Sequence, residues 1–369
     1  MATGMTILLL SLLMTAGSRV GELRTFEDWI VGCDNLHVCH ATTLNPESTE
    51  EEVAKGKNPP ADNFFNLSIK RAAGAKDQPR VRLFDCYQCE PEAGREPELA
   101  RELRVKDVTG AVLVRRLLLE REAFKLASDD GLPVSADGDL IEALGKGETV
   151  EVLDGEDGIM ATISLRGLGA SMRLIDENQH RTSNVTALIA RGPTNVDRAP
   201  PWIPEPIIYT PSPSDLPPVR LAGKKLVKLQ QKYRCGRPDS GLPKPTYERL
   251  DERTTMLLLF ANCSPYNGEG YVFLISEAQR IHPAPIRITS MGPSLELPQV
   301  ASAYWDQKAR RLHSFGRGRA LADCGQDQAF AWDGDQFILV EEADMGECRG
   351  SIDYITVYRR ETAVRGQRR

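Results

Sequence analysis

Residues 328–341 read QAFAWDGDQFILVE, and this short stretch decides the fold class. Apolar and aromatic residues recur at strand spacing on both sides of Asp333-Gly334, and an Asp-Gly step between two such runs is typical of a β-hairpin turn. We therefore expect residues 328–332 and 336–341 to form two antiparallel strands. This part of the chain is predicted to be β structure.

Further runs in the C-terminal part have the length and composition of strands, and they are flanked by Pro, Asn and Gly. Residues 301–305 and 312–315 flank a turn, so a second hairpin is expected there, and it continues into a Gly-rich loop that carries Arg317 and Arg319. The remaining expected strands are residues 254–260 (TTMLLLF), 271–275 (YVFLI) and 354–358 (YITVY).

Residues 193–218 (PTNVDRAPPWIPEPIIYTPSPSDLPP) contain nine prolines. Such density excludes a helix or a central strand and favours an extended, semi-rigid connector. A mature chain of about 350 residues also exceeds what one core usually organises. The sequence therefore predicts two β-rich domains, residues 19–192 and 223–362, joined by a Pro-rich linker at 193–222, with a basic tail at 363–369.

In the N-terminal part, residues 26–31 (FEDWIV) and 66–69 (NLSI) are predicted strands. A short helix is expected at 140–144, and residues 149–153 and 160–164 form a predicted hairpin around DGEDG. Leu165, Leu168, Met172 and Ile175 have helical spacing, which places one apolar helix face on that hairpin. Residues 104–124 suit either a buried strand or an amphipathic helix, and we favour a strand. The predicted class is mainly β with a few short helices (α+β).

The chain begins with an apolar run, MTILLLSLLM at residues 5–14, followed by small residues. This pattern is typical of a signal peptide, here residues 1–18, because the run is too short to span a bilayer. No later run approaches the roughly 20 apolar residues that spanning needs. We therefore expect a periplasmic or secreted protein with no transmembrane span in the mature chain.

Eight cysteines agree with export, because an even number in an exported chain indicates disulfides, although eight cysteines allow roughly a hundred connectivities. Their positions suggest four local pairs: Cys33 with Cys39, Cys86 with Cys89, Cys235 with Cys263, and Cys324 with Cys348.

Three segments resemble known exported bacterial families. FEDWIVGCDNLHVCHAT (26–42), LRGLGASMRLIDENQHRTSNVTALIARGP (165–193) and a tail pattern are similar to the family catalogued as domain of unknown function 1176. The tail pattern consists of Trp305, Arg317-Gly318-Arg319, Asp323-Cys324-Gly325, Trp332-Asp333-Gly334, Phe337 and Cys348-Arg349-Gly350. Residues 139–172 also resemble the C-terminal part of the invasion-associated locus B family, which implies a small β-rich domain from about residue 25 to residue 192. Neither resemblance implies a reaction or a ligand.

Two cysteine motifs are candidate reactive sites. Cys86 and Cys89 form a CxxC pair, which runs disulfide exchange when a thiol pKa is depressed. Glu90, Glu92 and Glu96 oppose such a depression, so a structural bridge is the favoured interpretation. Cys33, His37, Cys39 and His40 could bind zinc, but their spacing is compressed and an oxidising compartment competes for the thiols. We expect no metal, and without a GxSxG, HExxH, phosphate-loop or GxGxxG motif we expect no cofactor.

The net charge is only −6, with 46 basic and 52 acidic residues. This balance gives no general reason to expect nucleic acid or an acidic membrane as a partner. The basic C-terminus is predicted to be a solvated tail, and so are the hairpin-turn residues Arg310 and Arg311. The C-terminal arginines are Arg359, Arg360, Arg365, Arg368 and Arg369.

Arg317 and Arg319 are the candidate ligand-binding residues. Planar guanidinium groups between glycines on an aromatic-rich surface suit carboxylate or phosphate groups. Alternatively, they pair with Asp323, Asp327 or Asp335 and lock the hairpin. The sequence thus favours a non-enzymatic binding or structural module for an anionic envelope component or peptide, and the alternative is a thiol–disulfide exchange protein that uses Cys86 and Cys89.

Overall fold

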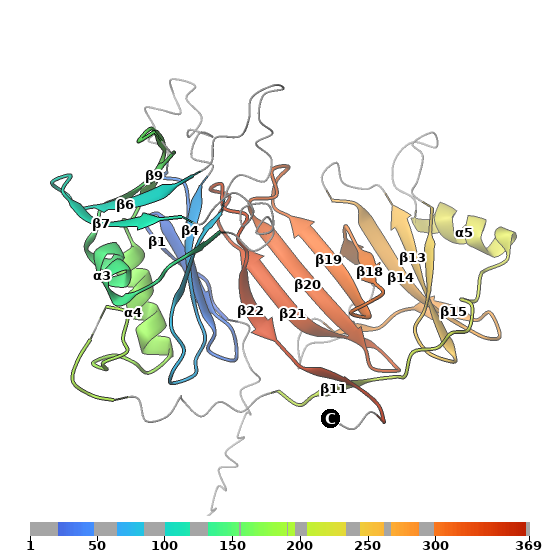
Figure 1. Ribbon diagram of the computed structural model, residues 1–369. Coiled ribbons are helices and arrows are strands. Elements are labelled where there is room, and N and C mark those ends of the chain that lie inside the picture. The colour runs from blue at the N-terminus through green and yellow to red at the C-terminus, as the bar shows by residue number, and fades with distance from the viewer. Residues whose placement is uncertain are drawn as a thin grey trace, which may run out of the picture.

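The structure is a computed structural model that describes residues 21–47, 65–84, 100–118, 132–154, 156–189, 191–195, 205–233, 244–261, 267–287 and 299–366. The fold is mainly β with a few short helices, so the predicted class is confirmed (Figure 1). The expected signal peptide lies outside the described residues, as do Cys86, Cys89, Cys235 and Cys263.

In its described residues, the N-terminal half contains two antiparallel sheets and two helices. The first sheet has the strand order β1-β2-β3-β4-β5-β8 and the second has the order β10-β9-β6-β7. The elements are β1 (Arg24–Phe26), β2 (Trp29–Cys33), β3 (Cys39–Thr43), β4 (Asn66–Arg71), β5 (Arg80–Phe84), β6 (Glu102–Lys106), β7 (Val112–Leu117), β8 (Leu132–Val134), α3 (Gly138–Lys146), β9 (Thr149–Leu153), β10 (Ile159–Ser164) and α4 (Leu168–Asn178).

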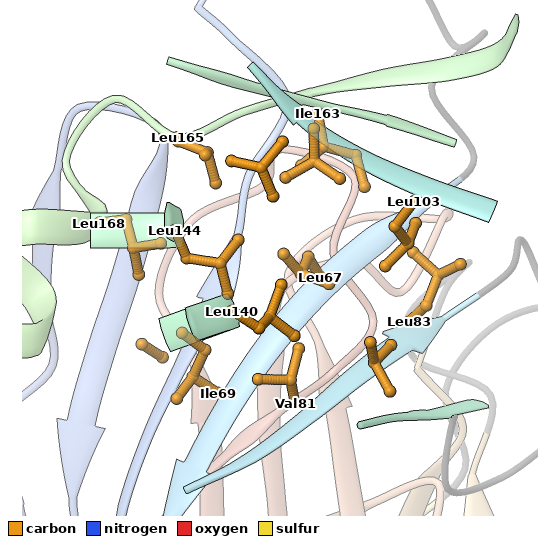
Figure 2. Close-up of a cluster of buried hydrophobic side chains, with 14 of the residues drawn as sticks. Leu67, Ile69, Val81, Leu83, Leu103, Leu140, Leu144, Ile163, Leu165 and Leu168 are labelled. Atoms are coloured by element: carbon orange, nitrogen blue, oxygen red, sulfur yellow. The ribbon is translucent and has the colours of Figure 1, made fainter. Parts of the chain in front are cut away.

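A single apolar core joins these elements (Figure 2). Leu67 of β4, Leu103 of β6 and Leu140 of α3 meet there, and each is almost fully buried. Helix α3 begins where Asp137 accepts a hydrogen bond from the backbone N–H of Leu140 (2.9 Å), an N-cap that satisfies one unpaired donor. The helix expected at 140–144 is therefore confirmed. The second expected helix is present as α4, but it packs mainly on β1, β2 and β3 of the first sheet and on α3, so its predicted place on the β9–β10 hairpin is wrong.

One expected strand in this half is wrong. FEDWIV is not continuous, because β1 ends at Phe26 and β2 begins at Trp29, and these two residues pair across the turn. Glu27 and Asp28 form the turn, with Glu27 at a φ of 50°. The polar residues 27 and 28 therefore break the strand. The segment 104–124 contains strands in its described part, where β6 pairs with β7.

The C-terminal half packs two sheets face to face. The outer sheet has the order β12-β13-β14-β15 with β17 also on β14, and the inner sheet has the order β16-β21-β20-β19-β18 with β22 also on β21. The elements are β12 (Thr246–Arg249), β13 (Thr254–Ala261), β14 (Glu269–Ser276), β15 (Ile281–Pro283), β16 (Ile286–Arg287), β17 (Gln299–Ala301), β18 (Tyr304–Asp306), β19 (Arg311–Arg317), β20 (Gly325–Trp332), β21 (Phe337–Met345) and β22 (Ile355–Arg359).

Strand β13 is apolar from Met256 to Ala261 because both of its faces are buried. Met256 and Leu258 point into the core between the two sheets, whereas Leu257 and Leu259 pack against a helix on the outer side. That helix is α5 (Gly223–Tyr233), which the sequence analysis did not predict. A strand covered on both faces gives a continuous apolar run in place of an alternating one.

The expected hairpin at 328–341 is confirmed as β20 and β21, with Gly334 at a φ of +110° in its turn. The expected strand at 301–305 is instead divided. Ser302 has a φ of 40°, so the chain turns there and β17 and β18 join different sheets. A strand that changes sheets in this way carries no distinctive local pattern.

The described part of the Pro-rich connector is tied to the end of the chain. Strand β11 (Ile208–Thr210) pairs in parallel with β23 (Thr362–Val364). Arg360 donates to the carbonyl of Pro206 (2.6 Å), and Arg365 donates to the carbonyl of Asp333 (2.6 Å). The prediction of a solvated tail is therefore wrong for Arg360, whose side chain is only 13% exposed, whereas Arg365 remains exposed to solvent.

Three other arginines predicted to be solvated also have partners. Arg359 lies 3.2 Å from the buried carboxylate of Asp34, and Arg311 lies 3.2 Å from Glu341. Arg310 donates to the backbone carbonyl of Leu250. These acceptors lie far away in the sequence or on another strand, so local charge patterning could not identify them.

The two halves meet along β22, which lies beside the strands of the first sheet (Figure 1). An apolar cluster joins Ile30 and Leu44 of the N-terminal half to Met345, Ile355 and Val357 of the C-terminal half. The backbone N–H of Gly21 also donates to the carbonyl of Val357 (2.9 Å). The start and the end of the described chain are therefore held together.

Candidate functional site

Residues 316–325, which we call the arginine loop, connect β19 to β20. The N–H of Gly318 donates to the carbonyl of Cys324 (2.7 Å), which closes the loop. A Cβ at Gly318 would lie 2.6 Å from Cys324 Sγ, and a Cβ at Gly325, whose φ is +141°, would lie 2.1 Å from the carbonyl of Gly316. The glycines are therefore needed for this close backbone approach.

Arg319 is held by a partner inside the loop. Its Nε lies 2.6 Å from Asp323 Oδ1, and its Nη2 donates to Oδ2 of the same carboxylate. Asp323 is 3% exposed and also accepts from the N–H of Gly350 (2.7 Å). Burial pushes the pKa of Asp323 upward, but the Arg319 and Gly350 donors outweigh it and hold that pKa below its ordinary value. The pairing alternative thus describes Arg319.

Arg317 differs, because its backbone is fixed and its side chain is exposed. The side-chain amide of Asn267 donates to the carbonyl of Arg317 (3.0 Å), and its oxygen accepts from the N–H of Arg317 (2.8 Å). The guanidinium carbon lies 5.9 Å from the centre of the Phe315 ring. Among the described residues no carboxylate forms an ion pair with Arg317, which leaves its donors available to a ligand.

An open groove of ≈ 610 Å³ runs beside the arginine loop, at the place where Leu23 approaches the ends of the inner-sheet strands. Its polar side chains are Arg317, Gln326 and Asp344. Glycines make up most of the remaining lining, so backbone groups are accessible there. The glycines are Gly21, Gly316, Gly318, Gly325 and Gly346.

Two carboxyl groups lie at and behind the groove wall. Glu342 is 5% exposed and accepts from the side-chain amides of Gln326 (2.9 Å) and Gln328 (3.1 Å). Asp344 Oδ1 is buried and has no hydrogen-bond partner among the described residues. Burial raises the pKa of both groups. Each is therefore protonated at a higher pH than an exposed carboxyl would be, and a protonated carboxyl can donate a hydrogen bond to an anion.

Aromatic rings lie on the inner sheet next to Arg317, and we call Tyr304, His313, Phe315 and Tyr354 the aromatic strip. Tyr304, 55% exposed, stacks on His313 with ring centres 4.7 Å apart, and Phe315 lies 5.6 Å from Tyr354. The hydroxyl of Tyr354 donates to the carbonyl of Ala322 (3.1 Å) in the arginine loop. Burial, assisted by Asp323 and Asp327, raises the pKa of Tyr354 to about 12, so the phenol stays protonated.

The other candidate residues lie elsewhere. Cys33 is joined to Cys39 by a disulfide, so neither thiolate is available to a metal. His37 contacts Asn178 (2.8 Å), and His40 contacts Asp353 (2.9 Å). Within the described ranges no cluster of three metal-ligating side chains occurs. The CxxC pair Cys86 and Cys89 lies outside those ranges.

The predicted disulfide between Cys324 and Cys348 is confirmed, and it anchors the arginine loop. The sequence analysis missed the other contacts that hold this region in place. Arg349, the residue after Cys348, donates to the carbonyls of Asn45 and Glu27 (2.7 Å each). The three parts of the tail pattern around Arg317, Asp323 and Cys348 therefore meet where the loop, the disulfide and the N-terminal half come together, whereas Trp332 and Phe337 lie in the core between the two C-terminal sheets. Asn267, Glu342 and Asp344 were also missed, because no short motif marks them.

Comparison with known proteins identifies one family model and one curated relative that each match most of the chain. A family model described as "Protein of unknown function (DUF1176)" matches residues 23–361. The "Uncharacterized protein YpfG" of Escherichia coli (strain K12) is 25% identical over 335 residues, which is 88% of each chain. The crystal structure of invasion associated protein b from Bartonella henselae is similar at 15% identity, covering 42% of this chain and 96% of that one with a TM-score of 0.26. That score is too low to carry an argument. In the described part of the chain, every helix is too short or too polar to cross a membrane.

Proposed function

The chain belongs to the family of proteins of unknown function DUF1176, which supplies no reaction, and we propose from the site that it is a non-enzymatic binding module. Its partner carries a carboxylate, as an envelope peptide or an acidic glycan does. Arg317 binds that carboxylate, and the groove and the aromatic strip contact the rest of the partner.

The observation that carries this proposal is the difference between the two arginines of the loop. Arg319 donates to Asp323, whereas Arg317 has a fixed backbone and a guanidinium on the groove wall that forms no ion pair with any described residue. A guanidinium fork pairs with a carboxylate through two parallel hydrogen bonds. Pre-ordering of the backbone reduces the entropy lost on binding.

Asp344 supports the same ligand class. A carboxylate ligand next to an ionised Asp344 would be repelled, but burial raises the pKa of this group and favours the neutral acid. The neutral acid donates a hydrogen bond with its proton. Binding of a carboxylate is therefore expected to strengthen as the pH falls toward the pKa of Asp344.

The test uses short acidic peptides with a free C-terminal carboxylate, each compared with its C-terminal amide, by isothermal titration calorimetry. Arg317→Ala should weaken binding of the free acid roughly tenfold to a hundredfold, the value of a lost charged hydrogen bond. Lys308→Ala removes an exposed cation at the far end of the same hairpin and should change nothing. Equal binding of acid and amide, or full binding by Arg317→Ala, would contradict the proposal.

Arg319→Ala separates structure from binding. It leaves Asp323 buried without its cation, so we expect the free energy of unfolding to fall by about 1–3 kcal/mol, a value reduced because Arg319 is partly exposed. Arg317→Ala should leave stability unchanged. If both variants lose stability equally, the two arginines are structural.

Export to the cell envelope belongs to the same proposal. The apolar run at residues 5–14 and the disulfides at Cys33 and Cys324 support it, because disulfides persist in oxidising compartments. We retain the linker at residues 193–222 as the boundary between two domains. N-terminal sequencing of the protein from the envelope fraction should give a start near residue 19, and an intact Met1 would contradict export.

A further inference from the structure

Helix α5 carries lysines on one side and apolar residues on the other. Leu226, Leu229 and Tyr233 pack on the outer sheet, where the Tyr233 ring lies 4.7 Å from Tyr271. At about 100° per residue the lysines fall within an arc of roughly 100° on the side away from that sheet. We call Lys224, Lys225, Lys228 and Lys232 the lysine stripe.

The lysine stripe is exposed and not neutralised. All four side chains are exposed, and among the described residues none forms an ion pair. Arg220, which is exposed and lies 5.0 Å above the Tyr247 ring, is a further cation in the segment that leads into the helix. Residues 216–233 contain no Asp or Glu, although the whole chain has a net charge of −6. The positive charge is therefore local, and the overall balance conceals it.

The stripe does not stabilise the helix that carries it. Lys224, Lys228 and Lys232 are spaced four residues apart, and like charges at this spacing repel each other in a helix. Apolar packing holds α5 in place, and although the ammonium of Lys232 lies 5.1 Å from the centre of the Tyr233 ring, no described carboxylate neutralises the four lysines, so their charge is available to a partner. A partner with distributed negative charge would remove the repulsion.

We infer that the lysine stripe is a docking surface for an anionic phospholipid bilayer. The stripe is about 12 Å long on a convex helix, which suits several headgroups at once more than a single small anion. Lysines are compact point charges on flexible stems that can each reach a different phosphate. Helix α5 lies at the end of the molecule opposite the N-terminal half, so docking there leaves the groove accessible (Figure 1).

The test is co-sedimentation of the protein with vesicles of equal parts phosphatidylglycerol and phosphatidylcholine, compared with pure phosphatidylcholine. Binding is expected to the anionic vesicles alone and to disappear in high salt, which screens surface charge. Each lysine near a bilayer contributes about fivefold, so the triple variant Lys224→Gln, Lys228→Gln, Lys232→Gln should bind roughly a hundredfold more weakly. Gln has a helix propensity close to that of Lys, and circular dichroism checks that the fold is kept.

The matched control is the triple variant Lys76→Gln, Lys146→Gln, Lys308→Gln, which removes three exposed lysines and has the same net charge. It should bind anionic vesicles like the unmodified protein. Equal loss in both triple variants would overturn the proposal, because net charge alone would then account for binding. The proposal would also be overturned if the protein did not co-sediment with anionic vesicles but bound a soluble anionic polysaccharide through the lysine stripe.

Discussion

The guanidinium of Arg349 lies 2.7 Å from the carboxylate of Asp28, although 321 positions separate the two residues in the chain. Asp28 sits in the β1–β2 turn, and its other oxygen accepts from the hydroxyl of Ser164 (2.8 Å). Arg349 follows Cys348, whose disulfide anchors the arginine loop. This pair therefore links the candidate site to the first turn of the fold.

Arg349→Ala should lower the free energy of unfolding by about 3 kcal/mol. The variant leaves Asp28, 8% exposed, without its cation and removes two hydrogen bonds to carbonyls. Urea unfolding measures the change. Arg24→Ala, which breaks an exposed pair with Glu22 at 3.8 Å, is the control and should cost less than about 1 kcal/mol. Similar losses in both variants would refute a special role for Arg349.

The two disulfides in the described residues should contribute different amounts to the free energy of unfolding. Cys324 and Cys348 are 24 residues apart, whereas Cys33 and Cys39 are 6 apart. On the chain-entropy model, replacing the first pair by serine should cost roughly 3.5 kcal/mol and the second roughly 2.4 kcal/mol. Thermal unfolding of the two double-serine variants gives the ranking, and a reversed order would show that local contacts outweigh loop length.

Glu342→Gln should change how stability depends on pH. Burial raises the pKa of Glu342 in the folded protein, so its favourable contribution is fully present below the unfolded pKa, near 4.5, and is lost as the pH rises through the folded value. The variant does not titrate and so lacks this loss of stability, provided that the side-chain amide of Gln326 or Gln328 rotates to present its oxygen to the new NH₂ group. We expect its stability relative to the unmodified protein to rise as the pH increases from about 4.5 through the folded-state pKa of Glu342, by about 1.4 kcal/mol for each pH unit of pKa elevation.

Urea unfolding at several pH values measures this difference. Glu341→Gln is the matched control, because Glu341 is on the opposite face of β21 and pairs with Arg311. A Glu342→Gln difference that is flat with pH would show that the folded and unfolded pKa values are the same.

Gly167→Ala should be strongly destabilising. Gly167 precedes α4 with a φ of +93°, and a Cβ there would lie 1.8 Å from the carbonyl of Phe26. Gly110 is the control: its φ is +84°, but nothing lies within 4 Å of an added Cβ, so Gly110→Ala should cost only about 1 kcal/mol. Chemical denaturation of both variants should show the Gly167 loss exceeding the Gly110 loss by several-fold, and equal losses would mean that β1 can move away.

Local patterns predicted much of the fold correctly. The Asp333-Gly334 turn and the apolar run of β13 correctly identified strands. A tight turn needs particular residues, and burial of both faces requires consecutive apolar residues, so both features are visible in a short stretch of sequence. Helix α5 was missed, since its first residues follow a Pro-rich segment and its lysines obscure a narrow apolar face. The strand at 301–305 was predicted whole because a change of sheet at Ser302 depends on partners far along the chain.

The candidate site was predicted only in part. Arg317 and Arg319 were identified from their glycine spacing, and their pairing with a nearby aspartate was one stated alternative. The sequence could not show that Arg319 is paired and Arg317 is not. Closure of the loop and the N–H of Gly350 place Asp323, and no other nearby aspartate, next to Arg319. Asp344 lies on a strand and Asn267 in a loop, both far from Arg317 in the sequence, and only the tertiary fold brings Asp344 to the groove and Asn267 to the backbone of Arg317.

The two sides of the apolar contact between the halves are synthesised at different times. Ile30 and Leu44 are synthesised early, but Ile355 and Val357, which cover them, follow about 300 residues later. At about 5–20 residues per second, a ribosome needs roughly 15–60 s to reach them. During that interval the apolar patch on the first sheet is uncovered. Ile30 and Leu44 therefore emerge early from the ribosome but are shielded from water only at the end of synthesis.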